Sequence, residues 1–303
     1  MNYFPKGNEE KNLIKFIAKY QYLLKKDSNL FFESNKYYMR RIKNLIDKKY
    51  IRKYKSYLVL DDLGIEYAKQ FNFEYNKINR NQKYMIRLFY LSHLGAFYNN
   101  CKTLQYIPSF SIKDKSILTK TARRYIGIFE IQGFEYLTYS ITTERDYQYI
   151  KSVMYDIQKE QTYRNIIILV DNIKRLNFND FTFGYNQVLL IDDTEENREK
   201  LKYMNNVDWK AIIDNLYGNK VHLSEYNFCD YTDSKNTYIS TFYFLDTEKI
   251  NRLKYFLSEN RNKTADIICP PELEFEIKKH LPNVNFRIIN LDEYTKKDVN
   301  IYG

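Results

Sequence analysis

The chain has 303 residues, of which 44% are apolar and 17% aromatic, so it is long and apolar enough to form two packed domains rather than a disordered chain. It carries 48 Lys and Arg residues against 38 Asp and Glu residues, a formal net charge of +10. The longest wholly apolar run is Ile166–Val170, which is far too short for a membrane-spanning helix.

The excess positive charge is concentrated near the N-terminus. Residues 1–60 contain 15 Lys and Arg and 5 Asp and Glu, whereas residues 61–303 contain 33 of each kind. A local field of this kind is typical of phosphate binding, because each neutralised phosphate releases a condensed counterion. The alternative is the solvated surface of a Lys-rich protein.

The three cysteines, Cys101, Cys229 and Cys269, are widely separated and form no CxxC pair, which argues against a disulfide framework or a zinc site. The first ten residues are polar and carry charges of both signs, unlike a signal peptide. We therefore expect a cytoplasmic protein that needs no cofactor, no metal and no membrane.

The first 75 residues have the pattern of a winged helix-turn-helix domain, with its DNA-binding part within residues 8–72. Apolar residues recur every three or four positions, and Ser34 or Asn35 can cap the second long helix. The predicted elements, in chain order, are a helix at 9–24, one or two helical turns at 25–33, a helix at 36–48, two short strands joined by a basic turn at 50–60, and a helix at 61–71.

The helix at 36–48 and the turn after it hold the candidate DNA-binding residues. One face of this helix is apolar and the other is basic. A recognition helix reads base edges in the major groove while a basic wing contacts phosphates, and Arg and Asn suit bidentate contacts with guanine and adenine. The candidates are Lys36, Tyr37, Arg40, Arg41, Lys43 and Asn44 on the helix, and Arg52, Lys53, Tyr54 and Lys55 in the hairpin. The alternative is a protein-interaction module with a charged, solvated surface.

Residues 76–122 are predicted to form a helical connector. A long apolar helix at 78–98 suits a dimer contact or a buried bridge, and we expect a homodimer on this basis. The segment 101–121 is more irregular, with Pro108 and scattered Ser and Lys residues.

From residue 123 to residue 303, strands alternate with helices, which predicts an α/β domain and a fold class of α/β, or α+β overall. The predicted strands are 125–131, 134–141, 165–170, 188–191, 238–245, 265–268 and 286–289. The predicted helices are 143–161, 194–204, 246–259 and 271–280.

Signals for catalysis are weak in this second domain. No GxxxxGK[ST] loop occurs, the histidines His93, His222 and His280 are isolated, and no single nucleophile stands out among 31 tyrosines. A hairpin followed by a helix and a strand is the core order of a restriction-endonuclease-like fold. The active site of a nuclease with this fold needs an acid-x-Lys pair on a strand to hold a metal and orient water. No such pair lies on the predicted hairpin, and Glu276-Ile277-Lys278, which has that spacing, falls on a predicted helix. We therefore expect no catalytic residue, although Glu130 and Glu135 lie on the predicted hairpin and Asp171 and Asp192-Asp193 stand at strand ends.

Three stretches resemble the replication-relaxation proteins of plasmids and other mobile elements: Tyr37–Ile51, Tyr57–Gly64 and Leu91–Asn99. The resemblance covers roughly residues 8–160. It implies a winged helix joined to an α/β domain of nuclease-like topology, in a protein linked to replication or mobilisation. Where many members have Pro-Asp in the first strand this chain has Ile126-Gly127, and the run Thr138–Ile141 replaces an acid expected in the second strand. These two departures predict that the α/β domain is degenerate and serves as a scaffold or a partner-binding module.

The sequence thus predicts a sequence-specific double-stranded DNA-binding protein of a plasmid or phage, acting in replication, partition or conjugative transfer, with a possible protein partner in that machinery. A transcriptional regulator with the same winged helix is the nearest alternative. An alternative of a different class is a metal-dependent DNA nickase that uses the α/β domain.

Overall fold

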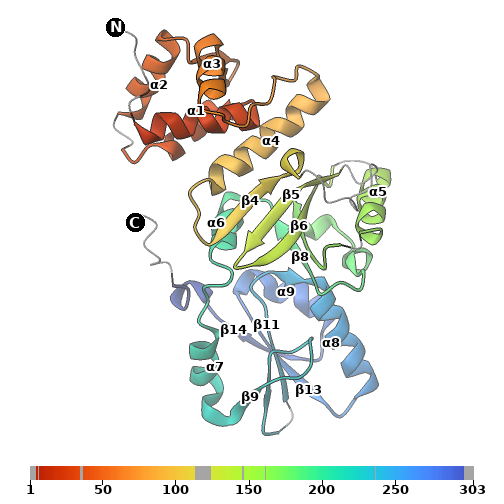
Figure 1. Ribbon diagram of the computed structural model, residues 1–303. Coiled ribbons are helices and arrows are strands. Elements are labelled where there is room, and N and C mark those ends of the chain that lie inside the picture. Colours follow the sequence, from red (N-terminus) through yellow and green to blue (C-terminus); the bar gives the residue numbers. More distant parts are fainter. Residues whose placement is uncertain are drawn as a thin grey trace. The chain divides into compact units, whose positions relative to one another are not determined.

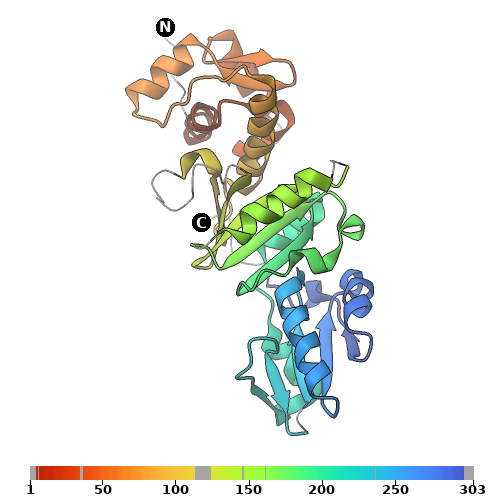
Figure 2. The same ribbon diagram turned by 90° about the vertical axis from the view of Figure 1, so that its right-hand side faces the viewer.

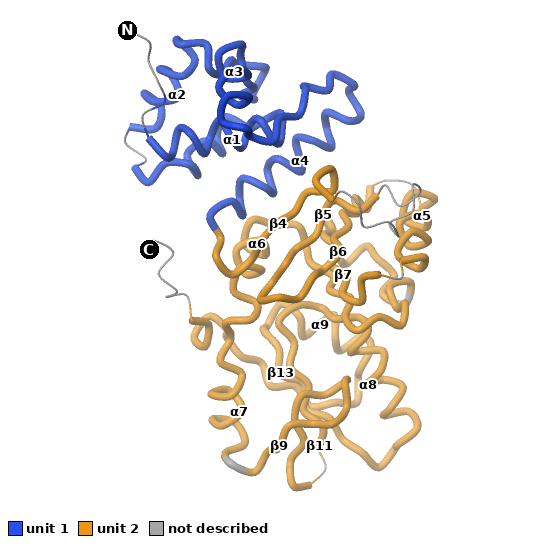
Figure 3. Tube along the Cα trace, viewed as in Figure 1, with its two compact units in different colours: residues 1–100 blue, residues 101–303 orange. Residues whose placement is uncertain are grey.

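The computed structural model describes residues 5, 7–34, 37–112, 124–144, 147–160, 162–235 and 237–296 (Figure 1). It is a mixed α/β protein, as predicted, and it divides into two compact units, residues 1–100 and residues 101–303 (Figure 3). Within the described ranges, no helix is both long and apolar enough to cross a membrane.

Unit 1 contains a small antiparallel sheet surrounded by helices. Its elements are α1 (Asn8–Tyr20), β1 (Leu23–Leu24), the 3-10 helix η1 (Lys25–Phe31), α2 (Tyr38–Asp47), β2 (Ile51–Tyr54), β3 (Tyr57–Leu60), α3 (Asp62–Gln70) and α4 (Gln82–Tyr98). The strand order is β1-β3-β2, with Leu23 opposite Leu58 and Ile51 opposite Leu60. The hairpin predicted at 50–60 is therefore confirmed.

The helix α1 buries the face that the apolar period predicts, with Leu13, Ile14 and Ile17 at its centre. It ends at Tyr20 rather than at the predicted residue 24. Gln21 adopts a positive φ of 70°, which stops the helix and turns the chain into β1.

The helix α4 belongs to unit 1 and β4 (Leu104–Pro108) belongs to unit 2, so the predicted connector 76–122 is divided between them. Ser92 of α4 donates a hydrogen bond to the carbonyl of Tyr22. Gly95 lets α4 pass close to the ring of Tyr20, since a methyl group there would come within 2.4 Å of the ring. Part of the predicted connector, residues 113–122, lies outside the described residues.

The first sheet of unit 2 has the order β12-β8-β7-β6-β5-β4, in which β12 is the short strand Leu245–Asp246. The strands β4, β5 (Tyr125–Ile131) and β6 (Phe134–Ile141) form an antiparallel meander, and β7 (Asn165–Val170) and β8 (Gln187–Asp192) continue parallel to β6. The helix α5 (Tyr147–Gln158) lies across this sheet (Figure 2), and α6 (Glu195–Lys202) follows β8.

The second sheet of unit 2 has the order β14-β13-β11-β10-β9. The strands β11 (Thr237–Thr241), β13 (Thr264–Cys269) and β14 (Asn285–Ile288) are parallel, while β9 (Val221–Leu223) and β10 (Tyr231–Asp233) are antiparallel additions. The remaining helices are α7 (Trp209–Tyr217), α8 (Thr247–Glu259) and α9 (Pro271–His280).

The two sheets of unit 2 share one apolar core. A single cluster of buried side chains includes Leu190 of β8, Ile267 of β13, and Ile250 and Leu253 of α8. The short strand β12 (Leu245–Asp246) leaves the second sheet's region to pair with β8 of the first. The predicted α/β domain is therefore one unit built on two sheets.

Candidate nucleic-acid interface

The helix α2 has one buried face and one exposed face, as its sequence predicts. Ile42 and Leu45 are buried, whereas Tyr37, Arg40 and Lys43 are exposed and Asn44 is half-buried. Tyr37 occupies the N-cap position and makes no side-chain cap bond, so Ser34 does not cap this helix. Of the predicted residues, Asn35 and Lys36 lie outside the described part of the chain.

Arg41 differs from the other predicted contacts on α2, because its guanidinium points into unit 1. It pairs with Glu9 and, at 3.1 Å between Nε and Oε1, with Glu10, whose side chain is 3% exposed. Its cation also lies 4.9 Å from the centre of the Phe32 ring. Arg41 was predicted as a DNA contact, and its place in the structure makes it the residue that ties α2 to α1.

Replacing Arg41 with alanine should loosen the contact between α1 and α2. Glu10 would keep a buried carboxylate without its cation, at a cost of about 2–4 kcal/mol. Hydrogen exchange of the α2 amides should be correspondingly faster, while Arg40→Ala, on the exposed face, should leave it unchanged. Equal exchange in both variants would contradict this role for Arg41.

The hairpin of β2 and β3 presents cations at its tip. Lys53 and Lys55 are exposed, and Lys55 adopts a φ of 54° in the turn. Arg52 is half-buried, and its Nε lies 3.8 Å from a carboxylate oxygen of Asp61. Lys53 and Lys55 are therefore the stronger candidates for phosphate contacts, with Arg52 partly held by the protein.

Aromatic contacts fix the base of this hairpin. The ring of Tyr57 stacks on Phe89 of α4 with 3.6 Å between the ring centroids, and both rings contact the buried Tyr22. Tyr54, which was predicted as a DNA contact, is half-buried, and its ring centroid lies 5.9 Å from that of Tyr22. A hairpin held in this way presents its turn in a defined direction.

The charge of the chain follows the division into units. Residues 1–100 contain 20 Lys and Arg and 9 Asp and Glu, whereas residues 101–303 contain 28 and 29. The positive field that would attract a polyanion therefore belongs to unit 1.

The acids at the strand ends of unit 2 hold loops in place. Asp171 accepts a hydrogen bond from the Thr143 amide at 2.8 Å, Asp192 accepts one from the Ile173 amide at 2.7 Å, and Asp193 pairs with Arg198 at 2.7 Å. Partial burial opposes ionisation of Asp171, but its hydrogen bonds prevail and lower its pKa. No group of three or more His, Cys, Asp or Glu residues within the described ranges could hold a metal ion.

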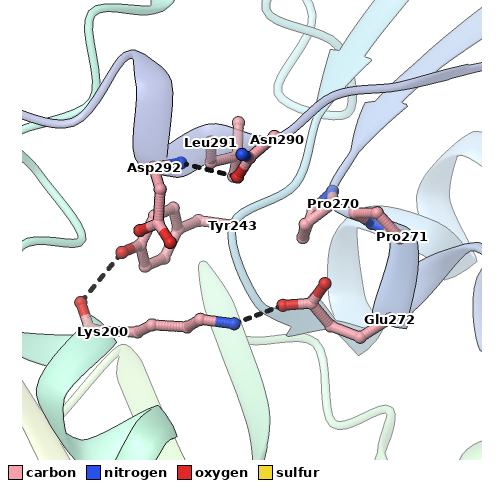
Figure 4. A pocket seen from close by; sticks show the side chains of 8 residues that line it. All are labelled: Lys200, Tyr243, Pro270, Pro271, Glu272, Asn290, Leu291 and Asp292. Atoms are coloured by element: carbon pink, nitrogen blue, oxygen red, sulfur yellow. Dashed lines mark hydrogen bonds and ion pairs between the residues drawn. The ribbon is translucent and has the colours of Figure 1, made fainter.

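A small pocket lies where the parallel strands of the second sheet end (Figure 4). The Nζ of Lys200, from α6, lies 2.6 Å from Glu272 of α9 and 2.9 Å from Glu196. Tyr243 donates a hydrogen bond to the carbonyl of Lys200 at 3.0 Å. These contacts join α6 to the second sheet, and sequence patterns did not identify the pocket because its lining comes from four separate segments.

Comparison with known proteins adds no assignment: no family model, no curated protein and no solved structure matches the chain. The resemblance to replication-relaxation proteins therefore stays a prediction from the residues quoted above.

Proposed function

We propose that unit 1 is a winged helix that binds double-stranded DNA, and that the protein acts as a sequence-specific DNA-binding protein. The observation that carries this proposal is the face of α2 opposite its buried residues, where Arg40 lies one helical turn from the exposed Lys43 and the half-buried Asn44. The major groove of DNA, about 12 Å wide, accepts an α-helix. The ten residues of α2 give this helix a length of about 15 Å.

The order of elements supports this assignment. Helix, short strand, helical turn, helix and hairpin occur in sequence, and the short strand β1 pairs with β3 of the hairpin. In this arrangement α2 is the reading helix and the hairpin is the wing that contacts the phosphate backbone. The excess of basic residues within residues 1–100 provides the attraction for the duplex.

A role at a plasmid or phage, in replication, partition or transfer, rests on the resemblance of residues 37–99. We include homodimer formation in the proposal, because paired half-sites are common for helix-turn-helix proteins. The nickase alternative gains no support from the strand-end acids, each of which bonds to a neighbouring loop or side chain.

The salt dependence of DNA binding tests the wing. Replacing Arg52, Lys53 and Lys55 with alanine should weaken binding to all duplexes about equally and reduce the slope of log affinity against log salt by about 2–3 units. Lys53 and Lys55 should account for most of the change, since Arg52 is near Asp61.

A matched control replaces three exposed lysines of unit 2, Lys210, Lys254 and Lys278, with alanine. This variant loses the same formal charge and should keep the full slope. If the slope of log affinity against log salt is unaltered in the hairpin variant, or equally reduced in both variants, the hairpin is not part of the interface.

A further inference from the structure

The outer face of α5 carries a regular alternation of tyrosine and lysine. Tyr147, Lys151, Tyr155 and Lys159 follow one another at intervals of four residues, the last of them directly after the helix. All four are exposed, with 57% of Tyr147 and 55% of Tyr155 accessible to solvent. Residues four apart lie on the same side of a helix, so the four side chains form one stripe.

Each tyrosine in this stripe pairs with the lysine that follows it. The Nζ of Lys151 lies 4.6 Å from the centre of the Tyr147 ring, and the Nζ of Lys159 lies 4.0 Å from that of Tyr155. The two rings are eight residues apart, a rise of about 12 Å along the helix. The stripe therefore presents two separated, exposed rings, each with a lysine cation over one of its faces.

The rest of α5 leaves this outer face without negative charge. Val153 and Ile157 are buried in the core of unit 2. The acid of the helix, Asp156, is half-buried and lies 3.8 Å from Arg124. None of the exposed residues of α5, all of which are described, is acidic.

The helix α9 provides a comparison within the same unit. Phe275 is 64% exposed, and Lys279 lies 4.4 Å from its ring centre. There, however, Lys279 also pairs with Glu276, and the helix begins with Glu272 and Glu274. An exposed aromatic and cation pair thus occurs beside acids of the same helix on α9, whereas α5 repeats the pair without an exposed acid in the helix itself, and the exposed Glu144 lies three residues before Tyr147.

We propose that the stripe on α5 binds single-stranded nucleic acid, with bases stacking on Tyr147 and Tyr155 and phosphates contacting Lys151 and Lys159. Exposed rings interleaved with cations have the chemistry of single-strand binding, because unpaired bases offer faces for stacking and the backbone offers negative charge. Paired bases in a duplex are already stacked and offer no such face. The stripe belongs to unit 2, so this proposal stands independently of the duplex-binding role of unit 1.

Titration of the full chain with a fluorescein-labelled oligothymidylate of about 20 nucleotides tests this proposal by fluorescence anisotropy. The double variant Tyr147→Ala/Tyr155→Ala should bind at least about 25-fold more weakly, since each stacked base contributes about 5-fold or more. Tyr147→Phe/Tyr155→Phe should bind the oligonucleotide about as tightly as the unaltered protein does, because the rings remain. Lys151→Gln/Lys159→Gln should reduce the salt slope by about 1.4 units.

Two controls separate this surface from others. Phe275→Ala/Lys279→Ala removes the equivalent pair on α9 and should bind the oligonucleotide as the unaltered protein does. Arg40→Ala/Asn44→Ala, on α2, should also keep oligonucleotide binding, which distinguishes failure of this proposal from failure of the duplex proposal. The proposal is overturned if the oligonucleotide does not bind, if the alanine pair on α5 binds it normally, or if the phenylalanine pair binds no better than the alanine pair.

Discussion

Replacement of Arg40 and Asn44 together with alanine is expected to abolish the preference of the protein for its DNA site over random duplex. Both residues lie on the solvent side of α2, opposite the buried Ile42 and Leu45. Each bidentate base contact contributes about 1–3 kcal/mol of discrimination. Replacing both residues should therefore make the free energy of binding less favourable by about 2–6 kcal/mol at the selected site and change it little on random DNA. Selection of a preferred site from a random duplex pool, followed by competition titration, measures this difference.

The matched control for this experiment is Lys69→Ala/Gln70→Ala, which removes an exposed cation and an exposed amide from the end of α3. It should leave the specificity ratio unchanged. If the α2 variant discriminates between sites as well as the control does, α2 does not read the bases.

Local patterns were sufficient to predict most of unit 1. Alternation and a basic turn located β2 and β3 correctly, and the apolar period of α2 identified Ile42 and Leu45 as buried. The role of Arg41 was not predictable, because its position on α2 resembles that of Arg40 and only the folded chain brings Glu9 and Glu10 beside it. A helical wheel cannot distinguish a cation that faces a groove from one that faces another helix.

Unit 2 shows where local patterns fail. The apolar run at 238–245 predicts one strand, but β11 ends at Thr241, whose amide donates to Asp230, and β12 pairs with β8 in the other sheet. No feature of the run itself marks this change of sheet. The helix α7 was missed although Asp208 caps it through the Ala211 amide, a signal that the sequence does contain.

The stripe on α5 was also readable in the sequence, since Tyr and Lys alternate at intervals of four. The functional interpretation needed the structure, which shows that the rings are exposed and that Asp156 is turned toward Arg124. Strands β9 and β10 have three residues each, too few for alternation to be distinguished from chance.

A buried carboxylate next to the first sheet organises the loop that precedes β8. Glu248, at the start of α8, is 2% exposed, and its Oε1 accepts hydrogen bonds from the backbone amides of Phe183, Gly184 and Tyr185 at 2.5, 2.7 and 3.2 Å. Arg252, one turn later, donates to the carbonyls of Tyr185 and Asn186. The loop's amides and carbonyls are thus both bonded by side chains of α8, which ties β8 to that helix.

Replacing Glu248 with alanine should destabilise unit 2 by about 3–5 kcal/mol, because three backbone amides, of Phe183, Gly184 and the buried Tyr185, would lose the buried carboxylate that accepts their hydrogen bonds. Glu248→Gln keeps an acceptor oxygen without the charge and should cost less, about 1–2 kcal/mol. Glu259→Ala, at the exposed end of the same helix, should fall within about 0.5 kcal/mol of the unaltered protein. Urea unfolding followed through the single tryptophan, Trp209, reports on unit 2 specifically. If the free energy of unfolding falls no further in Glu248→Ala than in Glu259→Ala, water replaces the carboxylate without cost and the loop does not depend on α8.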